Sequence, residues 1–311
     1  VMSLVSYLGP EGNLLEQTPG QARRVELKQP VLTAADLDKL RFCDDSACRT
    51  DFLEATFPAA EGTDGLEPAL TDLCRRAEEA VRGGATVLVL SDWSANDERA
   101  PIPSLLATGA VHHHLIRAGL RTQTSLVVET GEAREVAHFA LLIGYGAGAV
   151  YPYLAFETLD DMLERGMIEE DMDRDTVHHH YIKAVGKGLF KIFSKMGIST
   201  LQSYCGAQIF EAVGLSREFV ETYFRGTVTQ ISGAGVAEIA GDVMERHAFA
   251  HHTPHASDLT LEDGGYYHWR ASGERHSWNP TTITLLQRAC ATQDFDLYGK
   301  FSEAVNQNRQ E

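Results

Sequence analysis

The chain is poor in positive charge for its length. Of its 311 residues, 27 are lysine or arginine and 44 are aspartate or glutamate, which gives a net charge of −17 at pH 7. A surface of that sign repels nucleic-acid phosphates and anionic lipid headgroups. No stretch of interleaved basic and aromatic residues offsets this repulsion. The composition therefore argues against nucleic acid and against an anionic membrane as partners.

Long apolar runs and a secretion signal are also missing. No run reaches the roughly 18–20 apolar residues that cross a bilayer. The opening segment VMSLVSYLGPEGN lacks the basic start and cleavage pattern of a signal peptide. We therefore expect a cytoplasmic chain, or one whose targeting sequence lies outside this segment.

Cysteine is scarce and scattered. The five cysteines form no C-x-x-C motif, and Cys43 and Cys48 have no second pair that would complete a zinc site. We expect reduced, mostly buried thiols and no metal centre built on cysteine.

What the chain does have, from residue 66 onward, is a regular alternation of apolar strands and amphipathic helices. Strands are expected at 85–93, 123–131, 149–156 and 198–204, and helices at 66–84, 101–120, 132–148, 158–167, 176–196 and 206–215. Such alternation predicts parallel strands joined by right-handed crossovers. Because eight complete units cannot be counted, we predict an incomplete, barrel-like, mostly parallel β/α domain.

The flanking regions are less regular. An edge strand is expected at 25–32 and a helix at 32–41 with Thr33 as its N-cap. Beyond residue 216 the pattern predicts two further helices, a small hairpin near the C-terminus and two short final helices. These elements are expected at 216–227, 235–252, 263–279 and 280–307 respectively.

Polar residues stand where three of the expected strands end. Asp92 follows the first of them, Glu129 ends the second, and Gln202 lies near the end of 198–204. Ligand sites form at the carboxyl ends of parallel strands in α/β folds. One open interpretation is therefore a stand-alone α/β enzyme with its site at these three residues.

Two histidine triplets share a pattern of Val, three histidines, a variable residue, Ile, a basic residue and Ala. They occupy 112–114 and 178–180. Consecutive helix residues point about 100° apart, so a triplet cannot supply the i, i+4 ligand pair of a helical metal site. We expect one histidine of each triplet to pack, one to hydrogen-bond and one to meet solvent, with the two helices equivalent crossovers. For the cluster at 247–257 we expect a solvated helix end.

Glycine and lysine patterns admit structural explanations. GYGAG at 144–148 follows a helix and precedes a strand, the reverse of the dinucleotide-binding order, which favours a helix end and tight turn. VGKGL at 185–189 lies inside a helix and does not match a P-loop. Four lysines at 183, 187, 191 and 195 form a stripe that either docks an acidic partner or complements the helix dipole.

Several long segments together resemble the large subunit of glutamate synthase. These are VMSLVSYLGPEGNLL (1–15), the block from APIPSLLATGAVHHHLIRAGL to AVYPYLAFETL (100–159), YIKAVGKGLFKIFSKMGISTLQSYCGAQIFEAVGL (181–215) and WNPTTITLLQ (278–287). The resemblance covers nearly the whole chain and corresponds to the central domain of that subunit. It implies a central domain over 1–295 and the start of a linker towards the FMN-binding domain over 296–311.

The resemblance implies an oxidoreductase that transfers the amide nitrogen of glutamine to 2-oxoglutarate, with electrons from NADPH or ferredoxin. The family's other domains are an amidotransferase with an N-terminal cysteine and a synthase with FMN and a 3Fe–4S cluster, and a small NADPH-oxidising subunit or ferredoxin is a further partner. This chain begins with Val1 and lacks closely spaced cysteines. We therefore expect no cofactor, no metal and no catalytic residue here, and no activity of the chain alone.

In the family the central domain links the two active sites and contributes to the wall of an ammonia tunnel. The segment that matches the residues near this route runs from Met2 to Asn13. The resemblance therefore implies that Ser3, Ser6, Gly12 and Asn13 line the tunnel, with an ordinary N-terminal loop as the open alternative. Small polar residues and glycine offer a few hydrogen-bonding groups without filling the route.

Overall fold

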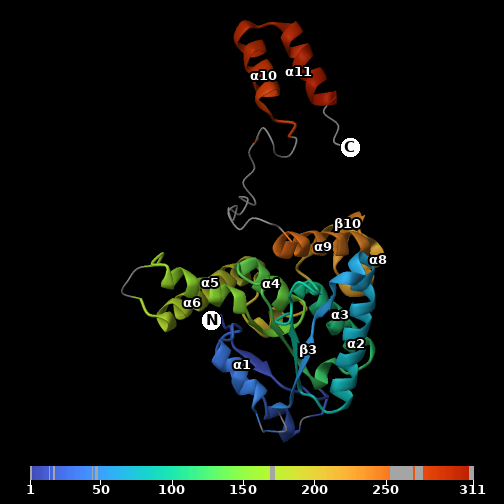
Figure 1. Ribbon diagram of the computed structural model, residues 1–311, viewed down its shortest axis with the longest axis vertical. Helices are drawn as coiled ribbons and strands as arrows, with labels where there is room; N and C mark the ends of the chain where they lie inside the picture. The colour runs from blue at the N-terminus through green and yellow to red at the C-terminus, as the bar shows by residue number, and fades with distance from the viewer. Residues whose placement is uncertain are drawn as a thin grey trace. The chain divides into compact units, whose positions relative to one another are not determined.

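A four-stranded parallel sheet lies at the centre of the computed structural model (Figure 1). Its strands, in spatial order, are β3 (Thr50–Glu54), β5 (Val87–Ser91), β7 (Ser125–Glu129) and β8 (Ala147–Tyr151). Beyond β8, Val31 pairs in parallel with Val150, which adds a short extended segment to that edge. The expectation of an incomplete, mostly parallel α/β domain is confirmed.

The structure describes residues 2–13, 15–16, 18–43, 45, 48–168, 172–252, 269 and 276–307. The chain divides into two compact units, 1–253 and 254–311. No helix within these described ranges is both long and apolar enough to span a membrane.

The two central strands are buried on both faces. Every residue of β5 and β7 is buried, as the continuous apolar runs VLVLS and SLVVE predict for strands covered on both sides. Side chains alternate between faces, so Leu88 and Leu90 join one hydrophobic cluster and Val87 and Val89 join the other. The sheet thus separates two cores.

Helices cover both faces of the sheet. The crossover helices α2 (Leu66–Arg82) and α3 (Ser104–Arg117) pack in the cluster that contains Leu88, and α1 (Ala34–Arg41) packs in the other. Figure 1 shows α1 on one side of β3, with α2 and α3 on the opposite side. Between β7 and β8 the chain forms α4 (Val136–Gly144), which ends at the GYGAG turn as expected.

Local capping explains where several helices begin and end. Thr33 accepts a hydrogen bond from Asp36 N and so caps α1, as predicted. The long helix α6 (Arg174–Met196) begins at the cap Asp173 and ends at Gly197, whose left-handed conformation (φ 71°) stops the helix. It follows α5 (Tyr153–Glu164), which succeeds β8. Because α6 joins no two strands of the central sheet, the expectation that it and α3 are equivalent crossovers is wrong.

The N-terminal segment runs along the amino ends of the sheet strands. Its strand β1 (Ser6–Leu8) pairs antiparallel with β2 (Val25–Leu27), so the expected edge strand over 25–32 is only partly formed. Gly9 and Ser125 exchange two hydrogen bonds, at 3.0 and 3.1 Å, at the start of β7. These contacts fix residues 6–9 against the amino end of the sheet.

Two expectations about 198–215 are wrong. The expected strand at 198–204 is instead the short helix α7 (Leu201–Tyr204), because Thr200 caps it by accepting from Ser203 N. The expected helix at 206–215 is instead the strand β9 (Glu211–Leu215), because Gly206 and Gln208 have positive φ values of 69° and 54° and cannot continue a right-handed helix.

The rest of the first unit completes a small substructure. β9 pairs in parallel with β10 (Val228–Ala234) through α8 (Arg217–Tyr223). The helix α9 (Val236–His252) follows, as the sequence predicts, and its Ala240 and Val243 are buried in the cluster that contains Leu88. The short strand β4 (Thr56–Pro58) and the 3₁₀ helix η3 (Ala59–Gly65) precede α2. The strand β6 (Arg99–Pro101), which pairs with β4, precedes α3. Two further short 3₁₀ helices are η1 (Pro19–Ala22) and η4 (Arg121–Gln123).

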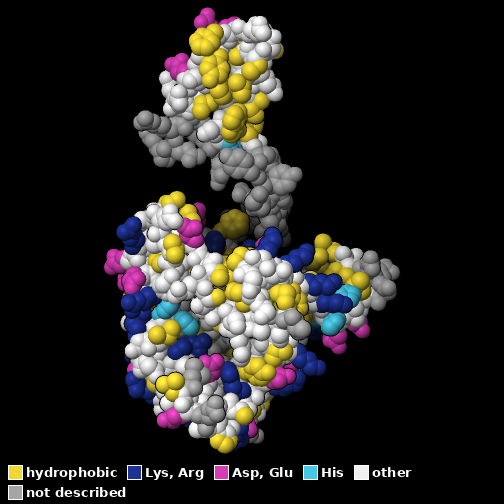
Figure 2. Space-filling model, turned by 180° about the vertical axis from the view of Figure 1, so that it is seen from behind, with side chains coloured by type: hydrophobic (Ala, Val, Ile, Leu, Met, Phe, Trp, Pro, Cys, Tyr) yellow, Lys and Arg dark blue, Asp and Glu magenta, His cyan; other side chains and the backbone are white. Residues whose placement is uncertain are grey.

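The described helices of the second unit are α10 (Pro280–Thr292) and α11 (Phe295–Gln307), which match the two expected short helices. Asn279 caps α10 and Pro280 occupies its first turn. Figure 2 shows apolar side chains gathered on this helical pair, and Phe295 is 82% exposed. The expected hairpin over 263–279 falls largely outside the described residues, and the family boundary at 295/296 stays a prediction.

Candidate functional site

Two of the three polar residues expected at the carboxyl end of the sheet do lie there together. Asp92 follows β5 and Glu129 ends β7, the neighbouring strand, and both side chains are buried. Asp92 Oδ2 accepts from Thr130 Oγ1 at 2.5 Å, and Glu129 Oε2 accepts from Ser91 Oγ at 2.6 Å. The two carboxylates are thus held by hydroxyls from neighbouring strands.

Burial controls the ionisation of Asp92. It raises the pKa of this carboxyl to about 6, although hydrogen bonds from Thr130, Tyr153 and Gly131 N favour the charged form. Burial, with the neighbouring Asp92, also raises the pKa of the Tyr153 hydroxyl. Asp92 therefore titrates closer to neutrality than an ordinary aspartate.

Gln202 is not part of this group, which corrects the expected three-residue site. It lies in α7 and lines a cavity of about 260 Å³ at the amino end of the sheet. Ser6 and Ser125 line the same cavity. Gln202 is placed there because 198–204 is not a strand and contributes no carboxyl end to the sheet.

The four residues implied for a tunnel wall occupy the N-terminal segment in different settings. Ser6 is buried and donates to Gly148 O at 2.7 Å, while Ser3 forms a parallel bridge with Thr200. Gly12 N donates to Thr122 O at 3.3 Å, and its φ of 68° is one that glycine adopts easily. Asn13 is exposed. Of the four, Ser6 alone is among the described residues that line the amino-end cavity.

A half-buried arginine borders the amino-end cavity and explains the setting of His112 in the first histidine triplet. Arg121 Nε donates to His112 Nδ1 at 2.9 Å, and its two terminal nitrogens donate to Thr124 O and Gly146 O at 2.7 and 2.8 Å. Burial, together with Arg121, lowers the pKa of His112 to about 3, so this imidazole is neutral and accepts the guanidinium hydrogen.

The other histidines have similarly local roles. His114 lies 2.7 Å from Glu78 and His178 lies 2.8 Å from Asp160, and His179 and His180 are exposed. The expected division of roles is therefore wrong for both triplets, because two histidines of the second are exposed and none of the first is.

The cluster at 247–257 differs from the expected solvated helix end. His247 is buried and lies 2.7 Å from Asn96 O, so the expectation is wrong for this residue, while His251 is exposed. Among the described residues no group of three or more His, Cys, Asp or Glu side chains is placed to hold a metal. The side chain of His252 and all of His255 lie outside the described residues.

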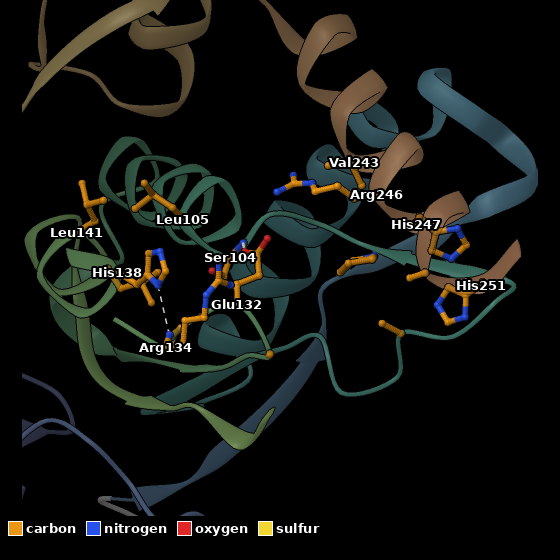
Figure 3. Close-up of a pocket in the computed structure, with 16 residues that line it drawn as sticks. Ser104, Leu105, Glu132, Arg134, His138, Leu141, Val243, Arg246, His247 and His251 are labelled. Carbon is orange, nitrogen blue, oxygen red and sulfur yellow. Dashed lines mark hydrogen bonds between the residues drawn. The ribbon is translucent and has the colours of Figure 1, made fainter. Parts of the chain in front are cut away.

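A larger pocket opens at the carboxyl side of the sheet, between the loops before α3 and α4 and the end of α9 (Figure 3). We call it the α4–α9 pocket; its volume is about 460 Å³. Its titratable lining residues are Glu132, Arg134, His138, Arg246, His247 and His251. A second cavity, of about 580 Å³, lies nearby between α1 and the sheet and is lined by Ser91, Trp93 and Glu129 among others.

Two lining residues of the α4–α9 pocket are held by hydrogen bonds at the starts of helices. Glu132 Oε2 accepts from Ser104 N, the first residue of α3, at 2.7 Å. His138 Nδ1 accepts from Arg134 N and Glu135 N, both at 3.2 Å, at the start of α4. Sequence reasoning missed this group; its available signal was the E-A-R-E-V-A-H segment, in which Glu135 and His138 have capping-box spacing.

The cysteines do not form a cluster site. Cys74 lies in α2, Cys205 follows α7 and Cys290 lies in α10, and only Cys43 and Cys48 interact with one another. A 3Fe–4S cluster needs several cysteines at one point. The described cysteines therefore do not fit such a cluster.

Comparisons with known proteins agree with one another. A family model described as the glutamate synthase central domain matches residues 1–216. The large chain of NADPH glutamate synthase from Bacillus subtilis is 41% identical over 309 residues, covering 99% of this chain and 20% of that protein. The corresponding chain from Azospirillum brasilense is 43% identical over 307 residues, covering 98% and 20%.

Relatives with another electron donor in their names match equally well. Ferredoxin-dependent glutamate synthase 2 from Synechocystis is 40% identical over 319 residues, covering 98% of this chain and 20% of that protein. A flavocytochrome b2 mutant with benzoylformate aligns structurally at 15% identity with a TM-score of 0.33, over 52% of this chain and 40% of that one, which is too weak to inform the fold. The chain spans about a fifth of the length of the curated relatives named here, and it belongs to the glutamate synthase central domain family.

Proposed function

We propose that the chain acts as the coupling domain between the glutamine amidotransferase and FMN synthase domains of a glutamate synthase. The observation that carries this proposal is the alignment, which covers 98–99% of this chain and only 20% of the two NADPH-dependent large chains. In that assembly the domain holds two larger catalytic domains at a fixed separation. The overall reaction transfers the amide nitrogen of glutamine to 2-oxoglutarate in glutamate biosynthesis.

The chemistry of the parent enzyme lies with its other domains in this proposal. FMN and a 3Fe–4S cluster belong to the synthase domain, and the electrons come from NADPH or ferredoxin, through a small NADPH-oxidising subunit or directly. The described cysteines of this chain do not fit the cluster. The setting is the cytoplasm, or the plastid stroma where the parent is a plastid enzyme.

A tunnel-wall role for the N-terminal segment extends the proposal. Ser3, Ser6, Gly12 and Asn13 would contribute to the route by which ammonia passes between the active sites. What supports this is the close attachment of the segment to the sheet through Ser6 and Gly9, which gives a fixed wall. Asn13 is exposed and its Oδ1 accepts from Leu15 N at 3.0 Å, which leaves its amide nitrogen for a neighbouring domain.

The first test uses the isolated 311-residue chain. We expect it to fold, to bind no FMN and to show neither glutaminase nor glutamate synthase turnover, because the catalytic groups belong to other domains. Absorbance at flavin wavelengths and assays of glutamine hydrolysis and glutamate formation check this. A purified protein that is yellow, or that hydrolyses glutamine, contradicts the proposal.

The second test uses a complete glutamate synthase that contains this domain. Asn13→Trp should narrow the route and lower the glutamate formed per glutamine hydrolysed by about tenfold or more, since 1.4 kcal/mol of added barrier is a factor of ten. Glu16→Trp is the matched control, because it lies exposed in the same segment and is not among the four implied residues. If the glutamate formed per glutamine hydrolysed is the same in the Asn13 variant, the control and the unmodified enzyme, Asn13 does not line the tunnel.

A further inference from the structure

The α4–α9 pocket carries positive charge on a strongly acidic protein. The whole chain has a net charge of −17, yet the charged lining residues of this pocket are two arginines and one glutamate. Three histidines, at 138, 247 and 251, add imidazole nitrogens to the same lining. Cationic groups gathered in a hollow on an acidic surface attract anions locally.

The single carboxylate is already engaged. Glu132 Oε2 accepts from Ser104 N at the amino end of α3, at 2.7 Å. A helix amino end carries partial positive charge, so it offsets part of the charge on this carboxylate. The glutamate therefore does little to neutralise the two arginines.

Within the part of the chain that the structure describes, the two guanidinium groups of the pocket have no carboxylate partner. Among the described residues neither Arg134 nor Arg246 forms an ion pair, and the side chain of Arg246 donates from Nε to the carbonyl oxygen of Asp242 at 3.2 Å. In the view of Figure 3, Arg246 extends from α9 toward the side of the pocket where Ser104 and Glu132 lie. Unpaired guanidinium groups favour oxyanions, which they bind through paired N–H donors.

His138 presents a further donor. Its Nδ1 accepts from two backbone N–H groups, at Arg134 and Glu135, so the neutral ring carries its proton on Nε2. That N–H is available to a ligand oxygen in the pocket that His138 lines. The backbone bonds at Nδ1 hold the ring in place, so the donor is positioned before a ligand arrives.

The remaining lining is apolar. Leu105, Leu141, Leu142 and Val243 line the α4–α9 pocket, and Figure 3 shows Leu105 and Leu141 at the same end of it as His138. The volume of about 460 Å³ lies in the range of small-molecule sites. An apolar wall with a few fixed donors suits an organic ligand better than a bare inorganic ion.

We propose that the α4–α9 pocket binds a small organic anion, with its carboxylate or phosphate group held by Arg134, Arg246 and His138 and its apolar part against Leu105 and Val243. The site lies at the opposite end of the sheet from the N-terminal segment. It is therefore separate from the proposed tunnel wall and does not depend on it.

Titration calorimetry on the 311-residue chain at constant ionic strength tests the proposal with three probes. Glutarate represents organic carboxylates, AMP represents organic phosphates, and inorganic phosphate represents the anionic group alone. We expect saturable binding of glutarate or AMP with a Kd below about 1 mM, and binding at least tenfold weaker for inorganic phosphate. The preferred organic probe then identifies which anionic group the pocket takes.

Two variants locate the binding site. Arg134→Gln and Arg246→Gln should each raise the Kd of the probe that binds about tenfold, because each removes a charge-assisted hydrogen bond. Both side chains belong to exposed residues, so the variants should keep the far-UV circular dichroism of the unmodified chain. Arg165→Gln in α5 is the control, as an exposed arginine outside the pocket that should leave Kd unchanged.

Three outcomes overturn the proposal. They are the absence of saturable binding by glutarate and AMP up to 10 mM, binding that neither pocket variant weakens, and inorganic phosphate binding as tightly as both organic probes. The last result would show that the apolar wall takes no part.

Discussion

At the scale of single residues, Gly146, His112 and Arg121 constrain one another. Gly146 has a φ of 113°, which L-amino acids with a side chain rarely adopt, and its carbonyl accepts from Arg121. A Cβ at this position would overlap the ring of His112. The glycine is therefore required both by its backbone conformation and by the neutral histidine beside it.

Gly146→Ala should destabilise the first unit by about 3 kcal/mol, from backbone strain and overlap with His112 together. Gly119→Ala is the matched control, since Gly119 has a φ of 69° but nothing within 4 Å of an added Cβ, so only strain of about 1 kcal/mol remains. Urea unfolding followed by circular dichroism measures both. Equal losses in the two variants would show that His112 does not crowd position 146.

Asp92 gives the molecule a pH dependence of defined sign. Its pKa is raised from 3.8 to about 6 by burial, so the folded state holds the proton more tightly than the unfolded state does. The stabilisation is fully present below the unfolded pKa near 4 and is lost as the pH rises through about 6. Between pH 5 and pH 7.5 this group should lower the free energy of unfolding by about 1.4 kcal/mol.

Asp92→Asn should remove that contribution. The difference in unfolding free energy between pH 5 and pH 7.5 is expected to change by about 1.4 kcal/mol relative to the unmodified chain. Asp97→Asn, at an exposed carboxylate five residues on, should leave the difference unaltered. If both variants keep the original pH dependence, burial does not raise the pKa of Asp92.

At the scale of elements, the packing of α6 against α4 depends on a small residue. Gly188 lies in α6, and an added Cβ there would overlap the side chain of Val136 at the start of α4. Gly188 in VGKGL therefore has a packing explanation. Gly241, in the middle of α9, has nothing within 4 Å of an added Cβ.

These two glycines should respond to the same substitution with opposite sign. Gly188→Ala is expected to destabilise by about 1–3 kcal/mol through overpacking. Gly241→Ala should stabilise by about 0.5–1 kcal/mol, because alanine favours a helix interior over glycine. Thermal and urea unfolding of both variants check this, and a stabilising Gly188→Ala would show that the two helices separate freely.

Elements with strong local signals were predictable from the sequence. The runs VLVLS and SLVVE identify strands buried on both faces, and Thr33 and Gly197 mark helix ends through side-chain capping and a left-handed turn. The segment 198–215 was not predictable in the same way. There the spacing of apolar residues fits both a helix and a strand. The choice of strand depends on the positive φ of Gln208 and on pairing with β10, which comes later in the chain.

At the scale of the whole molecule, the two hydrophobic clusters found among the described residues belong to the first unit. Both clusters on the two faces of the central sheet consist of residues within 1–253. The helical pair α10 and α11 in the second unit packs on itself and leaves Phe295 exposed. The two units thus differ in how much apolar surface each buries internally.

A chain truncated after Thr253 should therefore fold cooperatively. We expect it to keep the near-UV circular dichroism of its buried aromatic residues and the free energy of unfolding of the first unit within about 1 kcal/mol, because it retains both cores. A truncated chain without a cooperative urea transition would show that the first unit does not fold independently.

The sequence by itself determined the alternation of the main strands and helices from 66 to 156 and, through the resemblance of long segments, the family. The alternation follows from short-range properties, namely hydrophobic period and capping, whereas the family follows from residue identities along long segments. Tertiary structure alone decided which residues share a cavity. Gln202 lines the same cavity as Ser6, whereas Asp92 and Glu129 lie at the ends of neighbouring strands. The helix α9 places Arg246 beside the loops before α3 and α4. Such groupings depend on strand direction and on contacts between distant segments, which local patterns do not encode.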